Sequence, residues 1–191
     1  PVLGTECEMT IWTTTPWTLP SNLAVALHPD FTYVLGTFAK DGSERNFIVV
    51  RELIETFTEK TGWALQKEIG TLKGSELEGK KARHPFLDRD SLIINAQYVT
   101  VDTGTGAVHI APGHGMDDYI AGMQYGLPIL SPVDDDGKYT AECGVPALVG
   151  KHVFDSNEDV ITMLVERGRL LGREEFTHQY PHCWRSKTPI I

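Results

Sequence analysis

The 191-residue chain lacks any run of about 18 apolar residues, so no segment is predicted to cross a membrane as a helix. Cysteines are few: Cys7, Cys143 and Cys183 lie far apart and are odd in number. This pattern argues against a disulfide scaffold and favours a reducing compartment, the cytoplasm. The first residues show no signal-peptide pattern and no initiator methionine, so we expect a fragment of a longer protein.

Basic residues are fewer than acidic ones, with 17 Lys and Arg against 26 Asp and Glu, and the formal net charge is −9. A surface of this sign repels phosphates and is unsuited to a long nucleic-acid footprint. Any contact with nucleic acid is therefore expected to be local, or to be supported by another module.

Motifs of several enzyme classes are missing. Gly104 and Gly106 resemble the start of a dinucleotide-binding loop, but His109 occupies the position of the third glycine. No P-loop GKS or GKT follows, no GxSxG elbow is present, and no cysteine has an evident histidine partner in sequence. These absences exclude the common nucleotide-binding and nucleophilic-hydrolase patterns.

The chain also has no CxxC or HExxH motif. Two loose clusters could still supply metal ligands, one of His109, His114 and Asp118, the other of His178, His182 and Cys183. A zinc-dependent hydrolase that uses His109 and His114 therefore stays open as an alternative.

Short β-strands dominate the pattern of apolar and turn residues. Strands are predicted at residues 9–15, 23–27, 31–38, 47–50, 92–94, 98–101, 107–110 and 129–133. Helices are predicted at residues 51–60, 116–124 and 156–167, with Gly62 ending the first and Ser156 capping the last. We expect one α+β domain over residues 1–191, with a β-barrel-like sheet and a few peripheral helices.

The stretch "IWTTTPWTLPSN", residues 11–22, combines four threonines with two rigid prolines. Each threonine hydroxyl donates one hydrogen bond and accepts others, so several on one strand and turn could line a polar pocket. Threonine is also simply favoured in strands, which is the plainer interpretation. The prolines favour the polar-pocket interpretation, because a rigid turn suits a preorganised site.

A second dense stretch is "DTGTGAVHIAPGHGMDDY", residues 102–119. It predicts a strand, a Gly/Pro loop and a helix. His109 then lies at the strand end, His114 in the loop, and Asp117 and Asp118 in the first helical turn. The aspartates could merely favour the helix N-terminus, and His109 could be a hydrogen-bonded core histidine.

Together with the tail "YPHCWRSKTPII", these stretches resemble the editing domain of isoleucyl-tRNA synthetase, a class I aminoacyl-tRNA synthetase. Thr15-Pro16, where valyl and leucyl relatives typically carry Arg-Pro, and His109 favour the isoleucyl branch. The HIGH and KMSKS signatures are absent, so the chain alone is not expected to charge tRNA. Ser186 stands where many members have a cysteine after Cys183, so half of a zinc knuckle is missing.

The resemblance implies hydrolysis of valine from the 3′ end of tRNA(Ile), in a domain continuous with the catalytic domain and without a cofactor. Valine and isoleucine differ by one methylene, worth roughly 1–3 kcal/mol, a general figure already established for this amino-acid pair. One pocket therefore cannot reject valine firmly, and a second pocket hydrolyses the wrong ester. An inactive module that only holds tRNA acceptor ends is another alternative.

The resemblance also implies roles for individual residues. Asp118, rather than Asp117, would anchor the substrate ammonium, because a carboxylate with a pKa of about 3.9 is a weak base at pH 7. His109 would limit side-chain size and help to orient water. The implied catalytic residues are Asp118, Thr13, Thr14, Thr15 and His109. The implied substrate-binding residues are Trp12, Thr18, Asn22, Gly106, His109 and Asp118.

Overall fold

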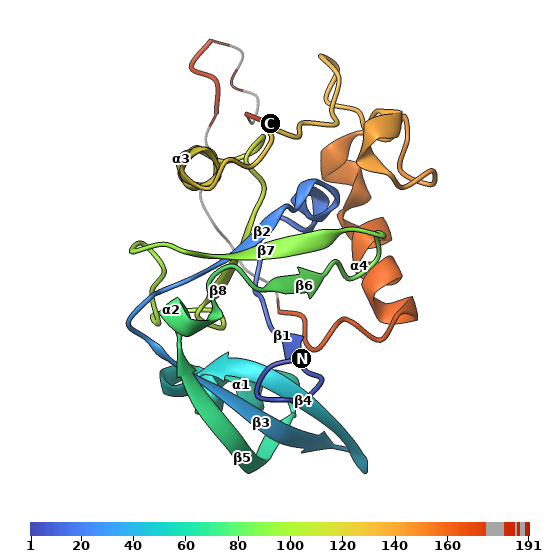
Figure 1. Cartoon of the computed structure of the whole chain (residues 1–191). Coiled ribbons are helices and arrows are strands. Elements are labelled where there is room, and N and C mark those ends of the chain that lie inside the picture. Colours follow the sequence, from blue (N-terminus) through green and yellow to red (C-terminus); the bar gives the residue numbers. More distant parts are fainter. Residues whose placement is uncertain (175–181, 186, 188–189) are drawn as a thin grey trace.

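The computed structural model describes residues 1–174, 182–185, 187 and 190–191 (Figure 1). Its described strands form two four-stranded sheets, in the orders β1-β4-β3-β5 and β6-β7-β2-β8. The first sheet contains β1 (Glu8–Met9), β3 (Thr32–Lys40), β4 (Ser43–Val50) and β5 (Ala64–Lys73). The second contains β2 (Ala24–Leu27), β6 (Lys81–Arg83), β7 (Asp90–Asn95) and β8 (Ala107–Ile110).

Helices lie around these sheets. The α-helices are α1 (Ile54–Thr61), α2 (Gly74–Leu77), α3 (Met116–Gln124) and α4 (Asn157–Glu166). The 3-10 helices are η1 (Pro16–Ser21), η2 (Arg51–Leu53), η3 (Ala141–Cys143) and η4 (Val153–Ser156). None of the described helices is long and apolar enough to cross a bilayer.

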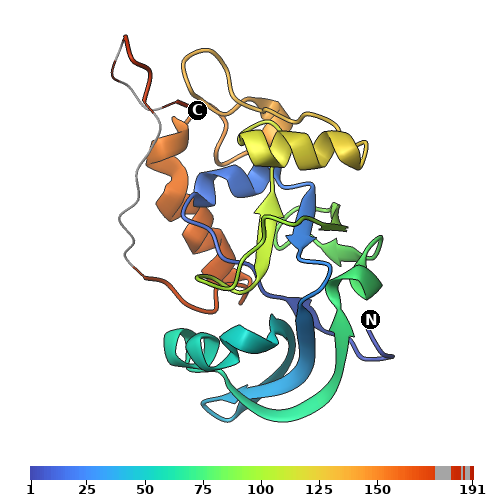
Figure 2. The same ribbon diagram turned by 90° about the vertical axis from the view of Figure 1, so that its left-hand side faces the viewer.

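The first sheet is built on a tight hairpin. Asp41 and Gly42 join β3 to β4 with φ angles of 49° and 79°, and two positive values match the twist of a two-residue hairpin turn. Helix α1 covers this sheet (Figure 2) and ends at Gly62, which has a left-handed φ of 75°. Phe47 and Phe57 belong to the aromatic core between them.

Strand β2 is the centre of the second sheet. It pairs in parallel with β7 and antiparallel with β8. All four of its residues are buried, which explains the continuous apolar run AVAL. Val25 and Leu27 share one core cluster with Tyr33 and Leu35 of β3, so the two sheets pack against each other.

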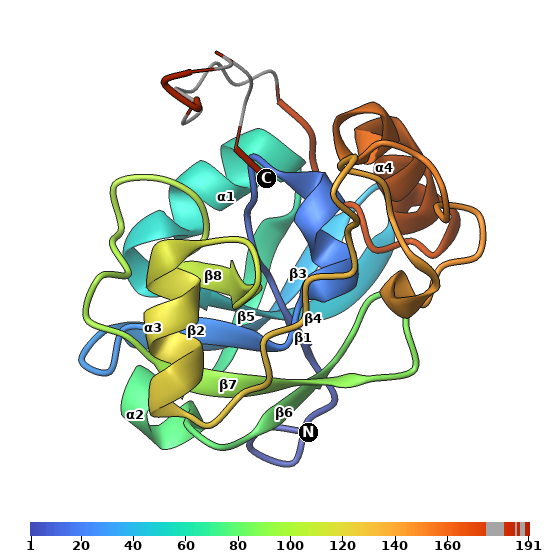
Figure 3. The same cartoon turned by 90° about the horizontal axis from the view of Figure 1, so that it is seen from above.

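Helix η1 lies between α3 and α4 on the side of the second sheet away from the first (Figures 2 and 3). Its Trp17 and Leu19 pack into a cluster with Val160 of α4. The backbone N–H of Trp17 donates to Asn157 Oδ1 at 3.0 Å. These contacts hold the threonine-rich segment that precedes η1 in a fixed place.

The predicted α+β class with peripheral helices is confirmed, although the described strands form two open sheets and no closed barrel. Helix α3 has the predicted bounds. Residues 9–15 are not one strand, because β1 ends at Met9, Trp12 forms only an isolated bridge with Val108, and Pro16 starts η1. Residues 98–101 and 129–133 form no named strand. Ser156 precedes α4, but its Oγ donates to Val153 O instead of capping the helix.

Candidate active site

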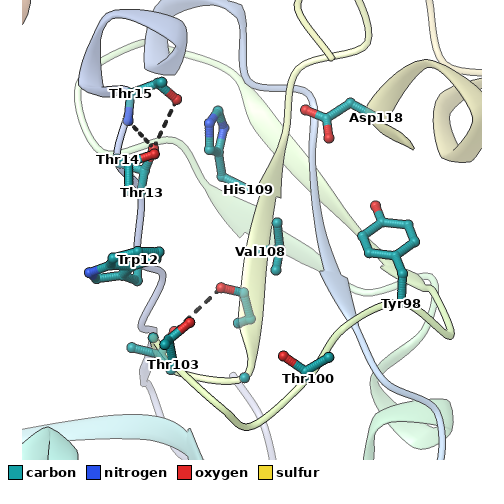
Figure 4. A pocket seen from close by; sticks show the side chains of 14 residues that line it. Trp12, Thr13, Thr14, Thr15, Tyr98, Thr100, Thr103, Val108, His109 and Asp118 are labelled. Atoms are coloured by element: carbon teal, nitrogen blue, oxygen red, sulfur yellow. Dashed lines mark hydrogen bonds between the residues drawn. The ribbon is translucent and has the colours of Figure 1, made fainter. Parts of the chain in front are cut away.

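A pocket of about 300 Å³ lies where three segments meet (Figure 4). The first segment, residues 12–15, leads into η1. The second is the loop from Tyr98 into β8, and the third is the N-terminal turn of α3. The pocket brings together most of the predicted site residues, which are residues 12–15, Gly106, His109 and Asp118.

The threonine segment is held by its own hydroxyls. Thr13 Oγ1 accepts from the backbone N–H of Thr15 at 3.0 Å and lies 3.3 Å from Thr15 Oγ1. Thr18 donates twice to the carbonyl of Thr15, from its backbone N–H at 3.0 Å and from Oγ1 at 2.9 Å. The threonines therefore stabilise the turn into η1, and Thr13, Thr14 and Thr15 also line the pocket.

His109 is a neutral residue of the pocket wall. It is only 7% exposed, and burial, together with the charges of the nearby His84 and His114, lowers its pKa to about 4. Nε2 lies 2.9 Å from Thr18 Oγ1, and Nδ1 lies 3.3 Å from the side-chain nitrogen of Asn22. Both ring nitrogens therefore have protein partners, and the ring orientation is fixed.

Thr18 and Asn22 lie behind this wall. They are 5% and 4% exposed, and they are outside the lining of the pocket. Their contacts with the pocket run through His109 and, for Thr18, through Thr15. The structure thus places these two predicted residues beside the pocket wall instead of in the pocket.

The two aspartates of α3 have different surroundings. Asp117 is exposed, whereas Asp118 is half-buried and its Oδ2 accepts from the backbone N–H of Ala111 at 2.9 Å. Burial raises the pKa of Asp118, the Ala111 hydrogen bond opposes this, and the charge of Asp117 raises it further. A Cβ on Gly115 would lie 3.1 Å from the Asp118 carboxyl carbon, so glycine leaves room for this side chain.

Figure 4 shows residues 12–15 on one side of β8 and Asp118 on the other, with Val108 and His109 between them. Tyr98 lies on the Asp118 side, and its pKa is raised by burial and by the charges of Asp118 and Asp117. The pocket thus has an anionic end and a hydroxyl-rich end. A ligand with a cation at one end and an ester at the other matches this polarity.

The two glycines of "GTG" shape the floor. Gly104 and Gly106 have φ angles of +81° and +72°. A Cβ at Gly104 would lie 3.3 Å from Trp12 Cβ, and one at Gly106 would meet Val50 at 2.5 Å. Trp12 is also held from outside, since its Nε1 donates to Glu174 Oε1 at 3.3 Å. These close approaches bring the loop, β4 and the indole together.

Among the described residues, no group of three or more His, Cys, Asp and Glu side chains could hold a metal ion. His114 instead places Nε2 3.1 Å from Ser21 Oγ and packs edge-on against Trp17. His178, a member of the second possible ligand cluster, and Ser186, which stands at the zinc-knuckle position, lie outside the described residues. The described part of the chain thus offers no complete zinc site.

Several lining residues were missed from sequence. Tyr98, Thr100, Thr103 and Thr105 line the pocket from a loop, although residues 98–101 were predicted as a strand. Thr100, Thr103 and Thr105 form a second hydroxyl-rich run directly before β8. That run could have indicated a second polar lining of the pocket. The alternation of Val99 and Val101 with Thr100 favoured a strand instead.

The model of the family described as leucyl-tRNA synthetase, editing domain, matches residues 1–158. The chain belongs to this editing-domain family. Relatives named isoleucine–tRNA ligase are 50% identical over 189 residues in Lactococcus lactis and 49% identical over 186 residues in Shewanella sediminis. These matches cover 99% and 97% of the chain but 20% of each relative, so the chain spans about a fifth of their length.

Solved structures of the editing-domain family have the same fold. The editing domain of the cytosolic leucyl-tRNA synthetase of P. falciparum matches with a TM-score of 0.66 at 10% identity. The match covers 85% of this chain and 78% of that one. The predicted recognition as a class I synthetase editing domain, with the isoleucyl enzymes among its relatives, is confirmed.

Proposed function

We propose that this editing domain removes valine from tRNA(Ile), as one domain over residues 1–191 of a larger isoleucyl-tRNA synthetase. Hydrolytic proofreading of misacylated tRNA follows from the family. The choice of valine is supported by the isoleucine–tRNA ligase relatives. The observation that carries the proposal is the pocket itself, with a half-buried carboxylate and a cluster of hydroxyls on opposite sides of a neutral histidine.

The anionic end suits the α-ammonium of an aminoacyl ester. The Ala111 N–H holds one oxygen of the Asp118 carboxylate, and the ammonium would pair with this fixed group. Because the carboxylate is half-buried, its interaction with a cation is stronger than that of a surface ion pair. Its raised pKa shows that a negative charge is unfavourable there without a partner, and an incoming ammonium supplies one.

The hydroxyl end suits the ester carbonyl and the attacking water. Thr13, Thr14 and Thr15 present oxygens on a segment held by the turn into η1. His109 is a poor candidate for a general base, because both of its nitrogens have partners and its pKa is about 4. We therefore infer that the site positions water and ester, and that proximity supplies much of the rate.

Selectivity for valine over isoleucine rests on the wall formed by His109. A fixed ring excludes an extra methylene by overlap, which discriminates more strongly than a difference in attraction. Its hydrogen bonds to Thr18 and Asn22 would keep the ring from turning away. Trp12 and Gly106 complete the substrate-binding surface.

The partner is the valine-bearing acceptor end of tRNA(Ile). With a net charge of −9, the domain is suited to hold only that end, and the other parts of the synthetase would hold the remaining tRNA. We propose that the reaction takes place in the cytoplasm, needs no cofactor and uses no metal.

The proposal is tested by incubating the chain with tRNA(Ile) charged with valine and measuring release of the amino acid. Asp118→Ala should lower kcat/KM at least about a hundredfold, because a half-buried ion pair is lost. Asp117→Ala, the exposed neighbour, is the matched control and should stay within about threefold of wild type. Equal rates for wild type and Asp118→Ala would reject the anchoring role. Binding of the acceptor end without hydrolysis would favour the inactive-module alternative.

A further inference from the structure

Ser91 of β7 is a buried polar residue outside the pocket. It is 3% exposed, and its Oγ donates to Oδ1 of Asn22 at 2.5 Å. Its neighbours in the strand, Leu92 to Ile94, contribute to the apolar core. A hydroxyl in such a place costs free energy unless it is hydrogen-bonded, so its single described side-chain contact, with Asn22, is the informative feature.

The amide of Asn22 has one possible orientation. The carbonyl of Ala24 can only accept, so the side-chain nitrogen of Asn22, 2.8 Å away, must face it. The amide oxygen then faces Ser91 and accepts from it. The second N–H of the amide points to His109 Nδ1 at 3.3 Å. Because an amide N–H can only donate, Nδ1 carries no proton and the ring proton is on Nε2.

This tautomer decides the direction of the next hydrogen bonds. Nε2–H of His109 donates to Thr18 Oγ1 at 2.9 Å, so the hydroxyl hydrogen of Thr18 is free to donate to Thr15 O at 2.9 Å. Thr18 can then only accept from Thr15 Oγ1, which lies 3.4 Å away. Thr15 in turn accepts from Thr13 Oγ1 at 3.3 Å.

In this pattern each hydroxyl hydrogen is used within the protein: Thr13 donates to Thr15, Thr15 donates to Thr18, and Thr18 donates to Thr15 O. Each hydroxyl oxygen has two acceptor positions, and those of Thr13 and Thr15 are only partly used by protein groups. At Thr13 and Thr15 the pocket therefore presents hydrogen-bond acceptors, whereas Thr14, which also lines it, lies outside this chain of bonds. A water molecule whose hydrogens are held by two acceptors turns a lone pair toward an ester carbonyl.

We propose that Ser91 is a positioning residue for the hydrolysis. By satisfying the amide oxygen of Asn22 it holds the amide where it donates to His109 Nδ1, and this keeps the threonine hydroxyls in the direction that holds the attacking water by its hydrogens. This inference rests on the proposed deacylation. Ser91 touches no substrate in it, and its effect is on the rate of the chemical step.

The first test is kinetic. Ser91→Ala leaves Oδ1 of Asn22 without its donor, and kcat for valine release should fall about tenfold while KM stays within about twofold. Ser91→Cys keeps the size and a weak donor, so it should restore part of kcat. Ser156→Ala is the matched control, because Ser156 is also fully buried and donates at 2.6 Å to a backbone carbonyl, Val153 O. It should leave kcat unchanged even if it lowers stability.

The second test reads the tautomer directly by ¹⁵N NMR of the histidine rings. Wild type and Ser156→Ala should show His109 with a protonated Nε2 and an unprotonated Nδ1. In Ser91→Ala the amide oxygen of Asn22 is left without a donor, so the side chain should leave, for part of the time, the rotamer in which it donates to Nδ1. The two nitrogen signals should then move toward each other as the ring populates both tautomers. A merely structural role for Ser91 would not change these signals.

The proposal is overturned if Ser91→Ala keeps the wild-type nitrogen signals, or if the signals shift while kcat does not. It is supported if the signals and kcat change together and Ser91→Cys moves both back. A wild-type chain without deacylation would reject the proposed function. The nitrogen signals would then still decide whether Ser91 sets the His109 tautomer.

Discussion

Two buried histidines, His84 and His109, and the half-buried His114 surround η1, so the domain should lose stability steeply in mild acid. Burial lowers the pKa of His84, His109 and His114 to about 4 in each case. In His84 burial outweighs the hydrogen bond to Leu19 O, which raises the pKa, and the charge of Arg89 lowers it further. Nδ1 accepts from the backbone N–H groups of Phe86 and Leu87 at 3.3 and 3.0 Å. Protonation of that nitrogen would remove both bonds.

The magnitude follows from the difference between folded and unfolded chains. An unfolded histidine titrates near pH 6.5, so below that pH the unfolded chain binds protons that the folded chain does not. Stability is fully present above this pH and is lost as the pH falls toward 4. For each histidine the slope is about 0.7 kcal/mol per pH unit at pH 6.5, where the unfolded side chain is half protonated, and rises toward about 1.4 below it. His84 and His109 together should therefore lower the unfolding free energy by about 3 kcal/mol between pH 6.5 and 5. Asp118, whose pKa is raised, acts in the opposite direction, but this single group does not offset the three histidines.

The measurement is urea unfolding followed by tryptophan fluorescence at pH values from about 7.5 to 5. His84→Asn keeps an acceptor near the position of Nδ1 but cannot take up a proton. It should lower the unfolding free energy at pH 7.5, because the bond to Leu19 O is lost. It should also reduce the slope of unfolding free energy against pH, because unfolding then takes up about one proton fewer. A flat wild-type profile between pH 6.5 and 5, or an unchanged slope in His84→Asn, would refute the assignment of buried neutral histidines.

Three further predictions concern the pocket. His109→Ala should admit isoleucine, so the ratio of the deacylation rates for isoleucyl- and valyl-tRNA(Ile) should rise at least about tenfold, and an unchanged ratio would assign the wall to another residue. Gly106→Ala should destabilise the domain by about 3 kcal/mol, because φ is +72° and the new Cβ would lie 2.5 Å from Val50. Gly42→Ala, with φ +79° and no atom within 4 Å, is its control in urea unfolding and should cost about 1 kcal/mol. Chelator-treated protein should keep its rate of valine release, and loss of the rate with recovery on adding zinc would restore the metallohydrolase alternative.

Local signals in the sequence were sufficient for much of the framework. The stop of α1 at Gly62 and the bounds of α3 each depend on residues close together in the chain. The same holds for the rigid threonine segment before η1. Asp118 and residues 12–15 were chosen as site residues from the resemblance of their two stretches to the editing domain, and the structure brings them to one pocket, though their roles stay predictions.

Only the tertiary structure decided the features that depend on distant partners. Strand β5 was missed because most of its residues are half-buried or exposed and show no clear period, yet it pairs with β3 along its length. Residues 98–101 look like a strand but form a loop that lines the pocket. Ser91 is indistinguishable from any other serine until β7 pairs with β2 and brings it to Asn22. The physical reason is the same throughout: strand pairing, burial and hydrogen-bond partners are set by residues far apart in sequence, whereas turns and caps are set by their neighbours.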